Sequence, residues 1–308
     1  MNVFFLGTSG SIPTNERNLI SIAIKREGKI YLFDPGENTQ QKMIQMKLSV
    51  LKVNSIFITH LHGDHIMGIP GLIMTSNLLN RNTDLTIFGP PGTKNFIDCF
   101  ITSVIINPNF NIIVNEITSD GLVYEDEEFQ IFSGFGEHGC FSLFYSFNEK
   151  PRKGKFNREK AIELNIPMGP TWKALHEGKD IILPDGRKIY SSQVVGSPRP
   201  GHKIVIALDT RPNEAILAAS RNADLLIFDG TFDDSLKEKA IETGHSTAKE
   251  GALLAKEASV KQLVLIHFSS RYSDLTALKD DVKDIFPDTM FPDDLTKIEL
   301  VYNKNERE

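Results

Sequence analysis

Short apolar runs alternate with longer amphipathic stretches along the chain. Five apolar runs have the length of a strand and are bounded by Gly, Pro, Asp or Asn; they cover residues 3–6, 30–33, 55–58, 85–88 and 204–208. Five longer stretches repeat apolar residues with helical spacing, at 39–46, 66–79, 213–221, 247–258 and 275–285. This alternation predicts an α/β protein.

The predicted strands fall into two blocks, one before about residue 150 and one after about residue 200. Because helices occur in both blocks, a sandwich of two sheets with outer helices accommodates the pattern. The intervening segment, about 149–200, is charged, rich in Pro and Gly, and poor in strand periodicity. No Ser/Gly-rich linker divides the chain, so we expect a single domain over 1–308 that carries this segment as an inserted arm.

Composition is that of a globular protein with a substantial core, since 40% of the 308 residues are hydrophobic and 24% are charged. The formal net charge of −6 argues against a surface that binds nucleic acid everywhere. Nucleic acid would therefore need a local basic patch. The start of the inserted segment offers one, in which Glu149 and Glu159 are outnumbered by Lys150, Arg152, Lys153, Lys155, Arg158 and Lys160.

The two cysteines, Cys99 and Cys140, are far apart and lack C-x-x-C spacing. Neither a disulfide framework nor a cysteine zinc knuckle is expected, and a reducing cytoplasm suits this usage. No apolar stretch reaches the roughly 18 residues of a membrane span, and the N-terminus lacks a signal-peptide pattern. We expect a cytoplasmic protein without membrane contact.

Potential metal ligands crowd the segment THLHGDH, which follows the apolar run at 55–58 and precedes a predicted helix. His60, His62, Asp64 and His65 lie within six positions, and Gly63 permits a tight turn. Zinc favours imidazole and carboxylate donors. Alternate residues can face different ions, so the segment predicts part of a metal site; the alternative is a surface cluster held by hydrogen bonds.

One such segment cannot supply all the ligands of two metal sites, so further ligands must come from distant positions. His138 lies in a loop after the run FQIFSGF, Asp209 ends KIVIALD, and His267 ends QLVLIH. Each follows a strand-like run. Taken singly, each has the alternative of capping a turn or completing a core hydrogen bond.

The H-x-H-x-D-H pattern resembles the metallo-β-lactamase superfamily, and this resemblance implies a four-layer αβ/βα sandwich with two Zn²⁺ ions per subunit. It also implies how the ligands divide. His60, His62 and His138 would hold one ion and Asp64, His65 and His267 the other, with Asp209 bridging them. Such ions supply a hydroxide nucleophile from water near neutral pH.

Further segments are similar to tRNase Z, short form, over nearly the whole chain. FFLGTSGSIPTNERN resembles a family loop near the RNA 3′ end, which implies RNA contacts for Arg17 and Asn18. HFSSRY resembles the last ligand followed by phosphate-contacting residues, here Ser269, Ser270 and Arg271.

The resemblance also implies a proton donor. GHSTA matches the loop that carries a catalytic histidine, here His245, and Asp229 in FDGT would replace the glutamate of the family's H-E-A-T motif. Asp64 would orient the nucleophile as well as bind metal.

The inserted arm is similar to the flexible arm, or exosite, with which tRNase Z grips tRNA, and NIPMGP matches its Gly-Pro motif at Gly169 and Pro170. The arm would contact RNA through Lys150, Arg152, Lys153 and Lys155. The family resemblance further implies a homodimer.

Together these features predict a zinc-dependent endoribonuclease that removes the 3′ trailer from precursor tRNA, leaving a 3′-OH on the tRNA and a 5′-phosphate on the trailer. The first alternative is a metallo-β-lactamase-fold phosphodiesterase or other hydrolase of a small molecule, which would not need the arm. The second is a non-catalytic RNA-binding protein that has kept the fold.

Overall fold

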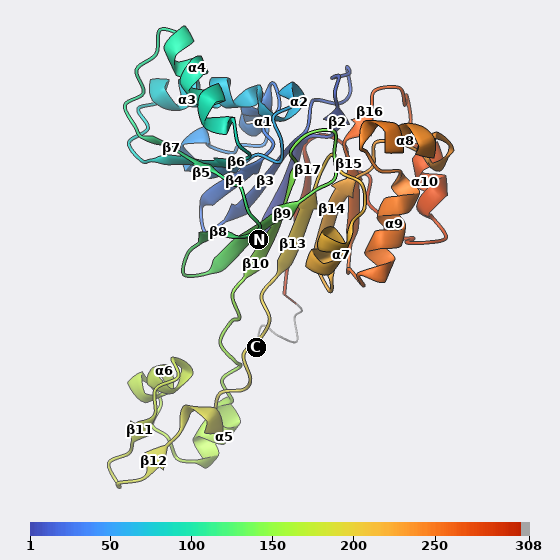
Figure 1. Ribbon diagram of the computed structural model, residues 1–308. Helices are drawn as coiled ribbons and strands as arrows, with labels where there is room; N and C mark the ends of the chain where they lie inside the picture. The colour runs from blue at the N-terminus through green and yellow to red at the C-terminus, as the bar shows by residue number, and fades with distance from the viewer. Residues whose placement is uncertain (303–308) are drawn as a thin grey trace. The chain divides into compact units, whose positions relative to one another are not determined.

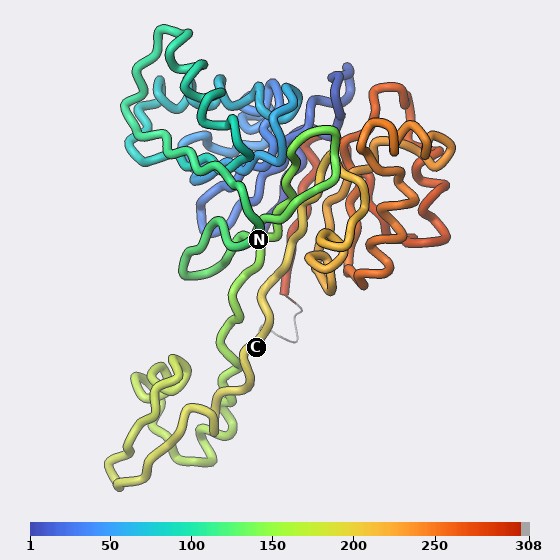
Figure 2. Tube along the Cα trace, in the orientation of Figure 1, coloured from blue at the N-terminus to red at the C-terminus, as the bar shows by residue number. Residues whose placement is uncertain are grey.

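The computed structural model describes residues 1–302 and separates into two compact units (Figure 1). The first unit contains Met1–Glu125, Gln130–Phe147 and Lys203–Leu300, and the second contains Asp126–Phe129, Asn148–His202 and residues 301–302. The Cα trace of the inserted segment leaves the first unit after Phe147 and returns to it at Lys203 (Figure 2). The sequence led us to expect a single domain over 1–308. Residues 303–308 of that range lie outside the described part.

The first sheet has seven strands in the order β17-β1-β3-β4-β5-β6-β7. β4, β5, β6 and β7 run parallel, whereas β1 pairs antiparallel with both β3 and β17. Its strands are β1 (Asn2–Gly7), β3 (Ser21–Arg26), β4 (Lys29–Phe33), β5 (Val53–Phe57), β6 (Leu85–Gly89), β7 (Ile112–Glu116) and β17 (Thr296–Glu299). The last strand of the chain thus completes the sheet built by the first block.

The second sheet has six strands in the order β15-β14-β13-β10-β9-β8, and β13, β14 and β15 run parallel. Its strands are β8 (Gly121–Glu125), β9 (Phe129–Phe135), β10 (Leu143–Glu149), β13 (Lys203–Ala207), β14 (Leu225–Asp229) and β15 (Leu263–Ile266). The two blocks of the sequence therefore both contribute to this sheet, because β10 and β13 flank the inserted segment and pair side by side.

Helices cover the outer face of each sheet (Figure 1). Those of the first sheet are α1 (Thr39–Gln45), α2 (Gly63–Ile66), α3 (Gly68–Leu78) and α4 (Thr93–Ser103), and those of the second are α7 (Glu214–Ser220), α8 (Lys237–Thr243), α9 (Ala248–Glu257) and α10 (Thr276–Val282). Short 3₁₀ turns occur at Val50–Lys52, Ser191–Gln193 and Asp234–Leu236. Between the sheets, aromatic rings interlock: Tyr145 meets Phe33 and Phe57 edge-on at 5.8 and 5.4 Å. The expected four-layer αβ/βα sandwich is confirmed.

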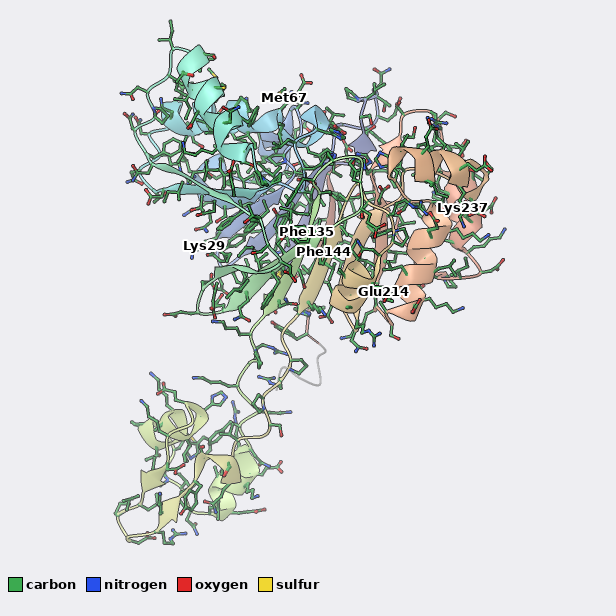
Figure 3. The ribbon with its side chains drawn as sticks, viewed as in Figure 1. Lys29, Met67, Phe135, Phe144, Glu214 and Lys237 are labelled. Atoms are coloured by element: carbon green, nitrogen blue, oxygen red, sulfur yellow. The ribbon has the colours of Figure 1, made fainter. Side chains whose placement is uncertain are left out.

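The predicted strands and helices are all present, with ends shifted by at most three residues. One difference concerns the site. The THLHGDH segment is not wholly a loop, because Gly63 already begins the short helix α2, and Met67 joins it to α3 (Figure 3). Asp64 and His65 are therefore fixed by helical geometry. None of the helices within residues 1–302 combines the length and apolarity needed to cross a membrane.

The second unit has a small core of its own. It contains α5 (Arg158–Glu163), α6 (Pro170–His176) and a hairpin of β11 (Ile181–Ile182) with β12 (Lys188–Ile189). Asn157 caps α5 by accepting a hydrogen bond from the Lys160 amide at 2.9 Å. These elements enclose the buried side chains of Ala161, Ile166, Leu175, Leu183, Ile189 and Val194.

Candidate metal centre

The ends of four strands supply the polar cluster. Asp34 follows β4, His60 lies three residues after β5, Asp209 lies two residues after β13, and His267 follows β15. Asp34, Asp209 and His267 have φ angles of 45°, 46° and 65°, in the left-handed region that costs a non-glycine residue energy. Strain of this kind concentrates at functional sites.

The carboxylate of Asp209 lies at the centre of the cluster. Its Oδ1 is 3.3 Å from His65 Nε2 and 3.1 Å from His267 Nε2. Its Oδ2 is 3.6 Å from His60 Nε2 and 3.9 Å from His138 Nε2. One oxygen therefore faces each of two histidine groups.

Two further predicted ligands complete these groups. His62 Nδ1 is 3.3 Å from His138 Nε2, so His62 joins the side that Oδ2 faces. Asp64 Oδ2 is 3.5 Å from His65 Nε2 and 3.4 Å from His267 Nε2, so Asp64 joins the other side. All seven side chains singled out in the sequence come together.

The outward nitrogens of four histidines are held by neighbours. The Nδ1 atoms of His60, His65, His138 and His267 lie 2.9–3.0 Å from Thr59 Oγ1, Asp34 Oδ2, Gly244 O and Thr231 Oγ1 respectively. Each contact fixes a ring orientation and leaves the Nε2 atom facing Asp209. Such supporting bonds are typical of histidines that ligate metals.

The atoms at the centre of the cluster are of the kind that binds a cation. His60 Nε2, His65 Nε2 and Asp209 Oδ1 are buried yet have no hydrogen-bond partner, which is costly unless an ion joins them. Burial and the neighbouring His65 keep the pKa of His60 well below its ordinary value, so this ring is a neutral donor. Burial would also lower the pKa of His65, but Asp209 and Asp34 raise it well above normal. A divalent cation between these groups would balance the same negative charge, so the cluster has the donors that a metal-binding site needs.

Asp64 is held from the N-terminal loop. The Ser11 amide donates to Asp64 Oδ2 at 2.8 Å. Gly10 lies so close to the His267 ring that an added Cβ would approach it to 2.4 Å, so only glycine fits there. The loop around residues 8–12 therefore positions two predicted ligands.

His245 forms a pair with a buried carboxylate beside the cluster. Its Nδ1 lies 2.9 Å from Asp229 Oδ2, and Asp229 Oδ1 accepts bonds from the Thr231 amide at 2.9 Å and hydroxyl at 2.6 Å. Burial lowers the pKa of His245, but the charge of Asp229 outweighs this and raises it to about 9. His245 Nε2 is 3.9 Å from Asp209 Oδ2, so the free side of the ring faces the metal cluster.

Arg211 links His245 to neighbouring loops by hydrogen bonds. Its Nη1 donates to the His245 carbonyl oxygen at 2.6 Å and to Glu250 Oε2 at 2.7 Å, and its backbone amide donates to the Glu137 carbonyl beside His138. Glu250 in turn accepts from the Thr247 amide at 3.0 Å, closing the cap of α9. Arg211 thus connects the loops that carry His138, Asp209 and His245, through its backbone amide on the first and its guanidinium on the last.

The predicted RNA-contacting loops lie next to each other, because β2 (Ser9–Gly10) pairs in parallel with β16 (Phe268–Ser269). Ser270 and Arg271 are exposed, and Arg271 lies over the Phe232 ring while its Nε donates to Ser269 Oγ. The predicted phosphate contact of Arg17 would have to displace internal partners, since its guanidinium donates to Thr8, Pro292 and Asp293. Asn18 Nδ2 likewise donates to the Glu37 carbonyl.

The predicted RNA-contacting residues of the arm differ in their exposure and in their contacts. Lys153 and Lys155 are exposed, whereas Lys150 donates to the Asp126 carbonyl at 2.6 Å and Arg152 lies over the Tyr302 ring at 3.2 Å. Gly169 and Pro170 are exposed at the start of α6. Gly169 has φ 119°, which favours glycine, and Pro170 occupies the first helical turn.

Several supporting residues were missed in the sequence. Asp34 ends the run KIYLFD in the same way that Asp209 ends KIVIALD, and that repeat could have identified it. Thr231, Arg211 and Glu250 gave no signal, because their importance depends on contacts between loops distant in sequence.

Comparisons with known proteins agree with this geometry. A family model described as anti-Pycsar protein Apyc1 matches residues 1–96, less than a third of the chain. A curated ribonuclease Z of Methanosarcina acetivorans is 44% identical over 303 residues, covering 98% of this chain and 99% of that protein. A ribonuclease Z of Treponema denticola is 37% identical over 304 residues, covering 98% and 99%.

Solved structures show the same relationship. Human tRNase Z, short form, superposes with a TM-score of 0.73 at 27% identity, covering 98% of this chain and all of that one. The metallo-β-lactamase fold protein YhfI of Bacillus subtilis, at 16% identity, has a TM-score of 0.69 over 96% of this chain and 98% of its own, and shows the shared fold. With this fold and full-length identity above 40% to a curated relative, the chain belongs to the ribonuclease Z family.

Proposed function

We propose that this protein is an endoribonuclease that removes the 3′ trailer from precursor tRNA, leaving a 3′-OH on the tRNA and a 5′-phosphate on the trailer. Family membership supports the reaction class. The single structural observation behind it is the Asp209 carboxylate, whose two oxygens face separate groups of metal-type ligands. A pair of cations held in this way is the usual arrangement for hydrolysing phosphodiesters.

The donor set fits two Zn²⁺ ions per subunit. His60, His62 and His138 would hold one and Asp64, His65 and His267 the other, with Asp209 between them; the opposed Asp209 oxygens and the unpartnered histidine nitrogens support this division. When bound, the ions supply an activated water as nucleophile and offset the charge of the scissile phosphate.

The side chains of this protein would then perform two tasks. Asp64, oriented by the Ser11 amide, positions the nucleophile. His245, held by Asp229 at 2.9 Å, gives a proton to the departing 3′ oxygen as the P–O bond breaks. Its position on the rim of the cluster, 3.9 Å from Asp209, supports this role.

Precursor tRNA would be gripped away from the cleavage site by the arm, through the exposed Lys153 and Lys155, and near it by Arg271, Ser269 and Ser270. Contacts of this type bind the phosphate backbone and follow the shape of the RNA. A local basic surface also explains how a chain with net charge −6 could bind a polyanion. A homodimer, implied by the family resemblance, and a cytoplasmic location, expected from the cysteine usage and the N-terminal sequence, complete the proposal.

The test is cleavage of a 3′-extended precursor tRNA by the purified protein, with and without a chelator, followed by mapping of both new ends. We expect a single chelator-sensitive cut after the acceptor stem. His62→Ala should abolish cleavage yet keep tRNA binding, which the non-catalytic RNA-binding alternative does not predict. Efficient hydrolysis of a small diester without any cleavage of precursor tRNA would contradict the proposal and favour the small-molecule alternative.

A further inference from the structure

The second unit contains a pocket that the backbone contacts proposed for the arm do not account for. Its volume is about 380 Å³, which lies within the range of pockets that bind small organic molecules. Among the described residues that line it there is no aspartate or glutamate. The lining includes two half-buried aromatic rings and a set of basic side chains: Phe156, Trp172, Lys155, Arg158, Lys173 and Arg199.

The two aromatic rings offer a flat apolar surface. Their centroids are 5.2 Å apart and the rings are tilted by 36°. The indole N–H of Trp172 is already satisfied, since it donates to the Ile166 carbonyl oxygen at 3.0 Å. His176, which also lines the pocket, meets the Phe156 ring edge-on at 5.9 Å, and its Nε2 lies 3.2 Å from the Gly154 carbonyl oxygen. Rings that are held in this way and are still partly exposed are suited to stacking on a further ring.

Helix α6 and the neighbouring backbone fix the aromatic residues. Pro170 begins the helix, and Trp172 and His176 lie on one face of it because they are four residues apart. The segment that carries Phe156 is fixed by an antiparallel bridge to Val195. The fold of this unit therefore holds both rings of the pocket in place.

The positive charges around the rings are not neutralised by neighbouring side chains. Lys155, Arg158 and Lys173 are exposed, and none of them forms an ion pair with a carboxylate in the part of the chain that the structure describes. Elsewhere in the same unit a lysine does have such a partner, since Lys188 Nζ lies 3.7 Å from Asp180 Oδ2. The pocket thus combines aromatic surface with uncompensated positive charge, which favours an anionic ligand that carries an aromatic ring.

We propose that this pocket binds a nucleotide, with the base stacked on Trp172 and Phe156 and the phosphate beside Lys155, Arg158 and Lys173. Two sources present this chemistry, an unpaired residue of the precursor tRNA and a free nucleotide. The tRNA source rests on the proposed function and extends it, because phosphate contacts bind any RNA backbone, whereas a stacking pocket accepts only a base that is not already stacked in a helix. The arm would then recognise a structural feature of the RNA as well as its charge.

Trp172 is the only tryptophan in the sequence, so intrinsic tryptophan fluorescence reports on this pocket alone. The full-length protein is titrated with adenosine monophosphate, with inorganic phosphate and with precursor tRNA, and the emission is corrected for absorption by the added ligand. We expect quenching by adenosine monophosphate and by tRNA, and none by phosphate. Lys173→Ala should raise the concentration of adenosine monophosphate at half-quenching about fivefold or more, because a charged contact is lost. Lys188→Ala removes the same charge outside the pocket and should behave as the parent does.

The salt dependence of tRNA binding provides a second measurement. Trp172→Leu removes the larger ring and should weaken tRNA binding about 5–150-fold, the usual effect of losing one stacked base. The slope of log affinity against log salt should stay unchanged, because stacking releases no counterions. Trp172→Phe keeps a ring and should retain most of the affinity. An altered salt slope in folded Trp172→Leu protein would indicate a purely structural role and contradict the stacking.

The outcomes separate the two sources and the two proposals. Quenching by tRNA, with or without quenching by the mononucleotide, supports an unpaired tRNA residue as the ligand. Quenching by adenosine monophosphate alone, while tRNA binds, identifies a free nucleotide instead. Quenching by neither, in protein that cleaves precursor tRNA, would overturn the nucleotide pocket and leave the proposed function intact. Folded protein that neither binds nor cleaves precursor tRNA would contradict the proposed function, and the response to adenosine monophosphate would still decide the pocket.

Discussion

Asp34→Asn is the sharpest single test of how the protein prepares its ligands. Asp34 is completely buried, and its two oxygens accept from the Thr59 amide at 2.7 Å, from the Thr59 hydroxyl at 2.7 Å, and from His65 Nδ1 at 2.9 Å. The Thr59 hydroxyl also contacts His60 Nδ1 at 3.0 Å. One carboxylate thus supports a ligand in each half of the centre.

The expected loss follows from counting donors. Three groups donate to two carboxylate oxygens, whereas an amide offers one oxygen and an NH₂ group that itself donates. Whichever way the amide faces, an N–H group meets another donor, and the lost buried bond costs about 1–3 kcal/mol. The clash between the two donors is relieved only if His65 turns or changes its protonation. We therefore expect metal affinity to fall about 10–100-fold, as is typical when a supporting partner of a ligand is removed.

The assay is competition for Zn²⁺ with a chromophoric chelator, combined with cleavage measured at limiting and saturating zinc. Asp224→Asn is the matched control, since Asp224 is mostly buried, accepts from the Lys203 amide at 2.8 Å and precedes β14 at the end of that strand opposite Asp229. The control should bind metal as the parent does. If folded Asp34→Asn protein binds zinc within twofold of the parent, the supporting role assigned to Asp34 is incorrect.

Three further predictions test other parts of the account. Asp229→Asn should lower kcat for precursor tRNA about 10²–10⁴-fold in single-turnover assays with unchanged metal content, because His245 loses the charge that holds it; an unchanged kcat would rule out this pair. Joint replacement of Lys153 and Lys155 by Ala should weaken tRNA binding and reduce the slope of log affinity against log salt by about one per lysine, while cleavage of a small diester stays constant; an unaltered slope in filter binding would exclude both contacts. Arg211→Met should lower the free energy of unfolding by about 1–3 kcal/mol in urea titrations, because Glu250 loses its nearest charged partner; equal stability would show that the network is dispensable.

The sequence predicted the layers of the fold because strand and helix periodicities are local. Apolar runs such as 30–33 and 204–208 became β4 and β13 almost as expected. The order of the strands within each sheet was harder to predict from the sequence. The pairing of β17 with β1 joins residues nearly 300 positions apart, and no local pattern specifies it.

The candidate site was predictable where ligand types follow strand ends, as with Asp209 and His267. The supporting contacts were not, because Asp34, Thr231 and Arg211 act through hydrogen bonds between separate loops. Arg17 illustrates the opposite difficulty: a motif position suggests a phosphate contact, yet packing directs the guanidinium toward Pro292 and Asp293.

The proposed centre has two cations separated by the Asp209 carboxylate. Anomalous scattering from crystals of the zinc-loaded protein, recorded on both sides of the zinc absorption edge, measures this directly. We expect two zinc peaks, one on each side of the Asp209 carboxylate, the first among His60, His62 and His138 and the second among Asp64, His65 and His267. Fully loaded crystals with a single peak, or with zinc only outside this cluster, would contradict it.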